Sequence, residues 1–290
     1  MNPRLWNLIL NRFIIPRRAP ASSAKYASIW TEEGPPLDVC MRSLAKKLRA
    51  ALPQDKAAFV DYAMSYSAPL IEDAFAECKA LGCDEVVVLP LYPQSAFSTT
   101  GVVKDKATEA MQKLEWSPSV RFVDSYCDEE SYINAIADSI SSTGFDPVAG
   151  DRLLFAFHSI PMADIRSGDT YEAQARRTAI RVAEKMILDD SSWRIGYQCR
   201  FDKSRAWLGP STTEVLGELT GAKRLFVVAP NFSVDCLETH YDIDIVLRRE
   251  YEAYRDREGK RELRYIPCLN DSENQIGLLR ELIAKKNKTE

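Results

Sequence analysis

The chain has only two histidines, and one of them, His158, directly follows an apolar run. The segment 153–162 reads LLFAFHSIPM, which predicts a buried strand that ends at a His-Ser-Ile-Pro turn. A neutral imidazole can accept a proton or bind a metal near pH 7. A histidine at a strand end can equally be held by a local hydrogen bond with no chemical role. Both interpretations of His158 stay open at this point.

Three acidic residues, Asp235, Glu238 and Asp242, recur at spacings of three and four within the segment 224–244. On a helix this spacing places all three on one face. The same Asp-x-x-Glu pattern resembles a capping box, in which the helix dipole favours acids at the N-terminal end. His240 lies two residues from Glu238 and therefore points elsewhere. Spacing alone does not separate a helix cap from a chemical site.

Two further segments have compositions suited to a ligand pocket. The segment 89–101, LPLYPQSAFSTTG, follows a predicted strand with Tyr92, Gln94 and several hydroxyl residues, although turn chemistry also explains it. The segment 197–212 places arginines and Trp207 near another strand end. A tryptophan in a cleft suits a flat aromatic ligand and arginines suit carboxylates, whereas a tryptophan packed under a loop needs no ligand.

Composition excludes several classes of protein. The 290 residues carry 38 basic and 42 acidic side chains, a net charge of −4, which provides no basic field for a nucleic-acid backbone. No apolar run in the sequence reaches the roughly 18 residues of a membrane-spanning helix. The seven cysteines include no Cys-x-x-Cys pair, which favours reduced, cytosolic thiols over a disulfide framework or a structural zinc site. The sequence also lacks phosphate loops, nucleophile elbows and His-Glu-x-x-His motifs.

The first 31 residues contain no acidic side chain but several basic ones. Leu5, Ile9 and Phe13 recur at helical spacing, with Trp6 and Leu10 alongside. Such a segment can pack on the body of the protein, lie on a membrane surface or act as a transit peptide. We favour packing and keep peripheral membrane contact as the next alternative.

Short β-rich apolar runs alternate with longer helical patterns along the chain. We expect strands at 59–65, 85–90, 120–125, 153–157, 194–199, 224–229 and 263–267. We expect helices at about 37–51, 67–82, 102–114, 129–143, 171–189, 212–220, 236–255 and 272–286. This alternation predicts an α/β fold with parallel sheets.

A Gly-, Pro- and Asp-rich stretch at 142–151 is a natural boundary between two halves of the chain. Three predicted strands precede it and four follow it. In open α/β sheets, ligands bind outside the carboxyl ends of the strands, so chemistry is expected where each strand stops. Residues and spacing thus indicate an α/β protein with a possible histidine and acid site.

Seven segments together resemble the ferrochelatase family, enzymes that insert ferrous iron into a porphyrin. They occur in family order over nearly the whole chain: KYASIWTEEGPPL (25–37), VVVLPLYPQSAFSTTG (86–101), FHSIPM (157–162), GDTYEAQ (168–174), YQCRFDKSRAWLGPST (197–212), PNFSVDCLETHYDID (230–244) and YIPCLND (265–271). The resemblance implies two Rossmann-like parallel-sheet domains with the porphyrin between them. The implied division is 1–140, with the C-terminal helix 271–290 packing back on it, and 141–270.

The resemblance also implies roles for the candidate residues. His158 and Glu238 are expected to be catalytic and to face the metal from one side of the macrocycle, with Asp242 continuing the acid line. Metal insertion has to remove two pyrrole N–H protons, which a histidine can accept, while carboxylates relay protons or hold the incoming cation. Bending the ring exposes the nitrogen lone pairs to the metal.

Tyr92, Gln94 and Trp207 are the expected porphyrin-binding wall. Fe²⁺ and protoporphyrin IX are the expected substrates and protoheme the product. Coproporphyrin or cobalt insertion, or a non-catalytic tetrapyrrole-binding role, are the alternatives. No cofactor is expected, and no [2Fe–2S] cluster, because no cysteine group follows Cys268. The expected location is the cytoplasm, with possible peripheral contact at the inner membrane.

Members of this family normally begin with an apolar strand and a helix ahead of the segment with which this chain begins. Together with the count of three strands before residue 150, this predicts a first domain that lacks one strand of its sheet. An interior parallel strand that is lost leaves unpaired backbone groups on both sides. We therefore expect weak activity from these 290 residues.

Overall fold

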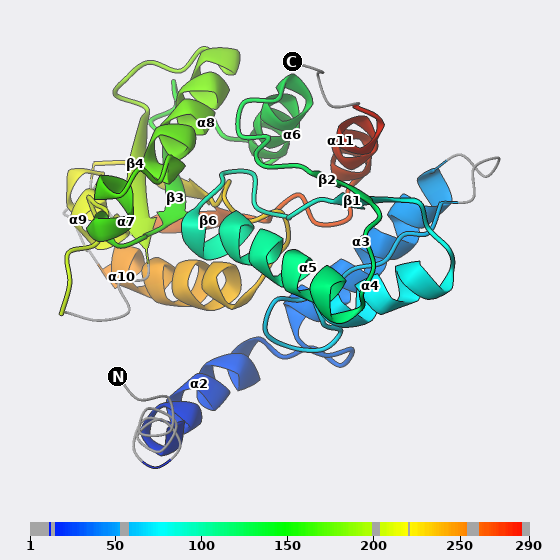
Figure 1. Ribbon diagram of the computed structural model, residues 1–290. Helices are drawn as coiled ribbons and strands as arrows, with labels where there is room; N and C mark the ends of the chain where they lie inside the picture. Colours follow the sequence, from blue (N-terminus) through cyan, green and yellow to red (C-terminus); the bar gives the residue numbers. More distant parts are fainter. Residues whose placement is uncertain are drawn as a thin grey trace.

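A computed structural model describes residues 12, 15–52, 58–198, 204–219, 221–253 and 261–285. It contains two parallel sheets covered by helices, which confirms the predicted α/β fold class (Figure 1). We call residues 36–128 the first lobe and residues 152–266 the second lobe. The two sheets differ in size, because the first has two described strands and the second has four.

The second lobe is built on a four-stranded parallel sheet in the order β4-β3-β5-β6. All four strands match predicted ones, with the bounds β3 Arg152–His158, β4 Trp193–Gln198, β5 Arg224–Val228 and β6 Glu262–Ile266. The register pairs His158 with Gln198 at the carboxyl end of β3. The predicted candidate histidine therefore ends a central strand of the larger sheet.

β3 is apolar on both faces, as expected for a strand with helices above and below it. Phe155 and Phe157 belong to one buried cluster, and Leu154 and Ala156 belong to another on the opposite face. The helices that supply these two clusters are α6 Glu130–Ser141 and α8 Tyr171–Lys185 on the first face, and α9 Thr212–Glu218, η3 Glu238–Leu247 and α10 Arg248–Ala253 on the second. A short helix, α7 Met162–Arg166, follows β3.

The first lobe has a smaller sheet of β1 and β2, which are parallel, and a separate apolar cluster. Its elements are α3 Pro36–Ala51, α4 Ile71–Ala80, β1 Glu85–Val88, α5 Val102–Lys113 and β2 Ser119–Phe122. Phe75 of α4 and Ala107 of α5 pack on the sheet side chains Val86 and Phe122. The residues of β1 are partly buried or exposed, in contrast to those of β3.

The predicted strand at 59–65 is wrong, because the described part of this segment is irregular up to a single bridge between Met64 and Leu70. Local partners take its backbone groups instead. The Val60 carbonyl accepts from Arg49 Nε at 3.1 Å, and the Tyr62 amide donates to the Asp61 carboxylate at 2.9 Å. The first lobe therefore shows two strands among the described residues, one fewer than the three expected from the sequence.

Two helices, α11 and α2, lie outside the two lobes as defined here. α11 Glu273–Ala284 packs against α3 and α6, and Arg121 of β2 donates to the Ile283 carbonyl at 2.7 Å. α2 Ile15–Ile29 projects from the body near η3 (Figure 1) and has no buried residue. The apolar set predicted at 5–13 lies outside the described residues. No helix in the described part of the chain is long and apolar enough to cross a membrane.

The predicted helix at 236–255 contains an unusual element. Ten of its residues, Glu238–Leu247, form the π-helix η3, and α10 continues it. A second, shorter π-helix, η2, spans Phe97–Gly101 and leads into α5. π-helices are rare and frequently lie at functional sites. Periodicity did not predict either one, because the apolar pattern of a short π-helix is close to that of an α-helix.

Candidate active site

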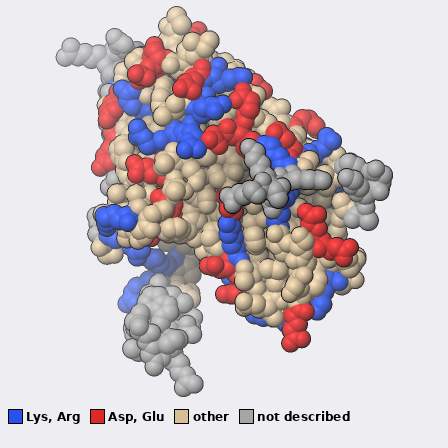
Figure 2. Space-filling view, turned by 45° about the horizontal axis from the view of Figure 1, so that its top comes forward, with Lys and Arg blue, Asp and Glu red and all other residues tan. Residues whose placement is uncertain are grey.

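A cavity of about 1610 Å³ opens between the two lobes and extends into the first lobe, where residues of α3, α4 and β1 line it. The predicted residues His158, Glu238, Tyr92, Gln94 and Trp207 all line it. On the face shown in Figure 2, acidic and basic side chains are interspersed over the surface, in keeping with the small net charge. The described residues contain no group of three or more His, Cys, Asp or Glu side chains placed to hold a metal ion.

His158 is partly buried at the carboxyl end of β3. Its Nδ1 lies 2.8 Å from the Ser159 carbonyl oxygen, so Nδ1 carries the proton that is donated and Nε2 is the basic nitrogen of the neutral ring. Burial lowers the pKa of His158, against the opposing effect of the Glu238 and Asp242 charges. The ring of Phe232 meets the imidazole edge-to-face at 6.4 Å between centroids. The site thus holds a neutral imidazole in one tautomer near pH 7.

Glu238 is the first residue of η3 and belongs to the cavity lining. Cys236, two residues before it, is buried, and burial followed by the Glu238 charge raises the pKa of its thiol well above its usual value. The proposed capping box is wrong, because the N-cap of η3 is Leu237 and no side chain caps it. Glu238 therefore presents its carboxylate to the cavity without serving as a helix cap.

Asp235 belongs neither to a capping box nor to the cavity lining, the two alternatives that its spacing left open. Its buried carboxylate accepts from Tyr265 at 2.5 Å, from Asn270 at 2.7 Å and from Thr239 at 3.0 Å. These bonds tie the start of η3 to the loop that follows β6. Asp235 therefore has a structural role. The sequence did not predict its bonds to Tyr265 and Asn270, because these partners lie 30 and 35 residues away in the chain.

Asp242 lies outside the set of residues that line the cavity. Its carboxylate is 3.5 Å from Lys25 Nζ of α2, and the same lysine lies 4.9 Å from the centre of the Tyr241 ring. Its charge still acts on His158, whose pKa it raises. Asp242 is therefore at the rim, one turn beyond Glu238 and beside the projecting helix.

Tyr92 and Trp207 face the cavity from opposite lobes. Burial raises the pKa of Tyr92, so its phenol stays protonated. Trp207 forms a bridge with Pro161, and the Leu208 amide donates to the Ile160 carbonyl at 2.9 Å. The tryptophan segment is thereby fixed beside the turn that follows His158.

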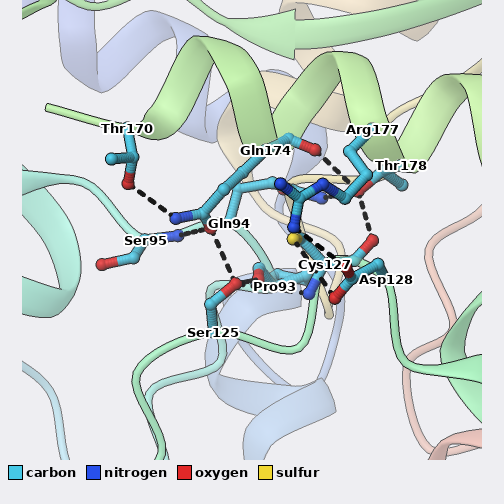
Figure 3. Close-up of polar contacts among 10 residues, drawn as sticks. All are labelled: Pro93, Gln94, Ser95, Ser125, Cys127, Asp128, Thr170, Gln174, Arg177 and Thr178. Carbon is cyan, nitrogen blue, oxygen red and sulfur yellow. Dashed lines mark hydrogen bonds and ion pairs between the residues drawn. The ribbon is translucent and has the colours of Figure 1, made fainter.

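Gln94 is 1 % exposed, and its amide nitrogen donates to Thr178 Oγ1 of α8 at 2.8 Å (Figure 3). It touches the cavity, yet its amide also joins the first lobe to the second. Its role as a porphyrin contact stays a prediction.

Sequence reasoning missed Phe232, Cys236 and Tyr26 of α2, whose phenol pKa is raised by burial and then by the Glu238 charge. Only the PNFS and DCLET segments gave a signal for the first two.

Comparison with known proteins identifies this arrangement. A family model described as ferrochelatase matches residues 1–287. A ferrochelatase of Azoarcus sp. (strain BH72) is 38% identical over 95% of this chain and 75% of its own length. This chain belongs to the ferrochelatase family. Ferrochelatase 1 of Shewanella oneidensis is 36% identical over 100% of this chain and 86% of its own.

Solved chelatase structures share the ferrochelatase fold seen here at low sequence identity. SirB from Bacillus subtilis with Fe³⁺ aligns over 87% of this chain and 92% of its own with a TM-score of 0.61 and 15% identity. CbiX, described as the terminal enzyme of siroheme biosynthesis in denitrifying bacteria, aligns over 87% and 93% with a TM-score of 0.56 and 18% identity. The predicted family and the predicted class, a metal chelatase, are confirmed.

Proposed function

We propose that this enzyme inserts Fe²⁺ into protoporphyrin IX to form protoheme, with His158 and Glu238 as catalytic residues. The observation that carries the proposal is the tautomer of His158. Its Nδ1–H is held by the Ser159 carbonyl, which makes Nε2 the basic nitrogen, and His158 lines a cavity that Glu238 also lines. A proton acceptor and a carboxylate at one cavity are what the reaction requires.

The cavity suits a large flat ligand. The part of it between the lobes is lined by His158, Tyr92 and Trp207, and the rest of its volume of about 1610 Å³ extends beside α3, α4 and β1 inside the first lobe. Tyr92 and Trp207 supply aromatic walls, and Arg205 lies 5.6 Å from the Trp207 ring at the rim, where a cation suits the propionate groups. Rigid walls that hold the ring in a bent form would expose its nitrogens to the metal.

The two catalytic residues divide the work. The neutral imidazole of His158, which burial keeps unprotonated, accepts the first pyrrole N–H proton and passes it outward before it accepts the second. Glu238 offers carboxylate oxygens, which suit a divalent cation that has to leave its water shell. Asp242 carries protons outward from the rim, where Lys25 neutralises part of its charge.

The test is an anaerobic insertion assay that offers Fe²⁺, Co²⁺ and Zn²⁺ with protoporphyrin and with coproporphyrin. We expect Fe²⁺ and protoporphyrin to give protoheme. Turnover of Zn²⁺ or Co²⁺ in addition is compatible with the proposal, because such sites select weakly among divalent ions. Iron insertion into coproporphyrin alone, or cobalt insertion alone, would contradict it.

We also propose that the enzyme works in the cytoplasm and needs no cofactor and no [2Fe–2S] cluster. We further propose that it contacts anionic membranes through α2. α2 carries Arg17, Arg18 and Lys25 and no acidic residue, and Ile15 is exposed on it. Basic residues next to exposed apolar ones favour an anionic lipid surface. Sedimentation with vesicles that contain anionic lipid tests the contact, and iron and sulfide analysis of the purified protein tests the absence of a cluster.

A further inference from the structure

The segment GDTYEAQ, residues 168–174, has no part in the chemistry described above, although it is one of the family-like segments. It covers the turn before α8 and the first turn of that helix. Its side chains bond to three places at once: the loop after β1, the loop after β2 and the end of β3. The first two belong to the first lobe and the third carries His158.

Asp169 makes the first connection. This side chain is 6 % exposed, and its two carboxylate oxygens have separate partners. Oδ1 accepts from the Tyr171 amide at 2.9 Å, at the first residue of α8 in the second lobe. Oδ2 accepts from the Phe97 amide at 2.7 Å, across to the first lobe. Phe97 begins η2, whose residues Ser98 and Thr99 line the cavity.

Gln174, one turn further along α8, makes the second connection (Figure 3). Its Oε1 accepts from the Ser95 amide at 2.9 Å and from Ser125 Oγ at 2.7 Å, so one oxygen holds both first-lobe loops. Its amide nitrogen donates to Thr170 Oγ1 at 2.8 Å, which fixes which end of the amide faces the first lobe.

Tyr171 makes the third connection. Its hydroxyl donates to the backbone carbonyl of His158 at 2.8 Å, and burial raises the pKa of this phenol well above its usual value. One helix end therefore holds the strand end that carries His158 and, on its other side, the η2 wall of the cavity.

We infer that residues 168–174 are a clamp between the lobes, in which Asp169 and Gln174 are positioning residues that set the η2 wall against His158 and so preorganise the porphyrin cavity. This inference rests on the proposed function for its ligand. A wall that is already in place loses little freedom when the ligand binds, which favours affinity. Loosening the clamp should therefore weaken porphyrin binding more than it slows the chemical step.

Four variants test the clamp. Asp169→Asn keeps one acceptor oxygen for the Tyr171 amide but turns an NH₂ donor toward the Phe97 amide. Gln174→Leu removes the shared acceptor, and Gln174→Glu retains it. Asp128→Ala is the matched control, because the Asp128–Arg177 pair, at 3.0 Å, also joins the lobes but lies half exposed at the surface.

Two readouts apply to each variant: protoporphyrin affinity from fluorescence titration, and hydrogen exchange of the segment 93–101 in the ligand-free protein. We expect Asp169→Asn and Gln174→Leu to weaken affinity about tenfold, the effect of losing a hydrogen bond to a charged or shared acceptor, and to speed exchange. Gln174→Glu and Asp128→Ala should match the wild type in both readouts, and kcat should change little throughout.

Equal effects in all four variants, or no effect in Asp169→Asn and Gln174→Leu, would overturn the clamp. If Asp169→Asn fails to fold, the contrast between Gln174→Leu and Gln174→Glu decides. A wild type that binds no porphyrin would refute the proposed function, while exchange of the segment 93–101 would still decide on the clamp.

Discussion

The two lobes of this ferrochelatase-family protein differ in how completely their sheets are built. In the second lobe, the five central residues of β3 are fully buried between two apolar clusters. In the first lobe, β1 has one described partner strand, and none of its residues is fully buried. Both proposed catalytic residues, His158 and Glu238, follow strands of the more complete sheet, and the first lobe contributes wall residues. Proton chemistry needs tight geometry, so its placement on the more rigid scaffold makes physical sense.

Truncation of one core side chain in each lobe should show this difference most strongly. Phe155→Ala in β3 removes a fully buried ring, which typically costs about 3–5 kcal/mol. Val88→Ala in β1 removes partly buried methyl groups that pack on the first-lobe cluster and should cost about 1 kcal/mol. Urea unfolding of both variants measures the free energies. Similar losses would mean that the two sheets contribute equally to stability.

Glu238→Gln tests whether the acid at the start of η3 serves chemistry. Iron insertion should fall by about 10²-fold or more when the carboxylate is lost. Stability should change by less than about 1 kcal/mol, because Glu238 does not cap the helix. Asp244→Asn is the control, since Asp244 lies on the same π-helix, pairs with Arg248 at the start of α10 and does not line the cavity. Equal activity in the two variants would leave Glu238 without a catalytic role.

The sequence predicted the second lobe much better than the first. Its two central strands, β3 and β5, contain continuous apolar runs at 153–157 and 225–228, because a strand buried on both faces has to be apolar throughout. The segment 59–65 is also rich in apolar residues and is irregular, because strand formation also needs a pairing partner, which composition does not report. Site residues at strand ends, such as His158, could be found for the same reason. Phe232 and the partners of Asp235 come from tertiary contacts that spacing cannot reveal.

A smaller effect should appear in the pH dependence of kcat/KM for iron insertion. The neutral form of His158 is the active one, so the rate should rise with pH through the pKa of this residue. Burial lowers that pKa, and the midpoint should therefore lie below the usual value of about 6.5. Asp242→Asn removes a charge that favours the protonated ring and should move the midpoint lower still, by less than about one pH unit. An upward shift would contradict the assigned electrostatics.

The central claim is that the imidazole of His158 takes the pyrrole protons, and single-turnover metallation tests it most directly. Protoporphyrin is bound first, its affinity is measured by fluorescence, and Fe²⁺ is then added anaerobically to the wild type, His158→Ala and His240→Ala. His240 is the control, because it packs on Tyr265 and does not line the cavity. The account predicts that His158→Ala binds porphyrin but metallates it about 10²–10⁴-fold more slowly, while His240→Ala stays near the wild type. A near-wild-type metallation rate in His158→Ala would contradict it.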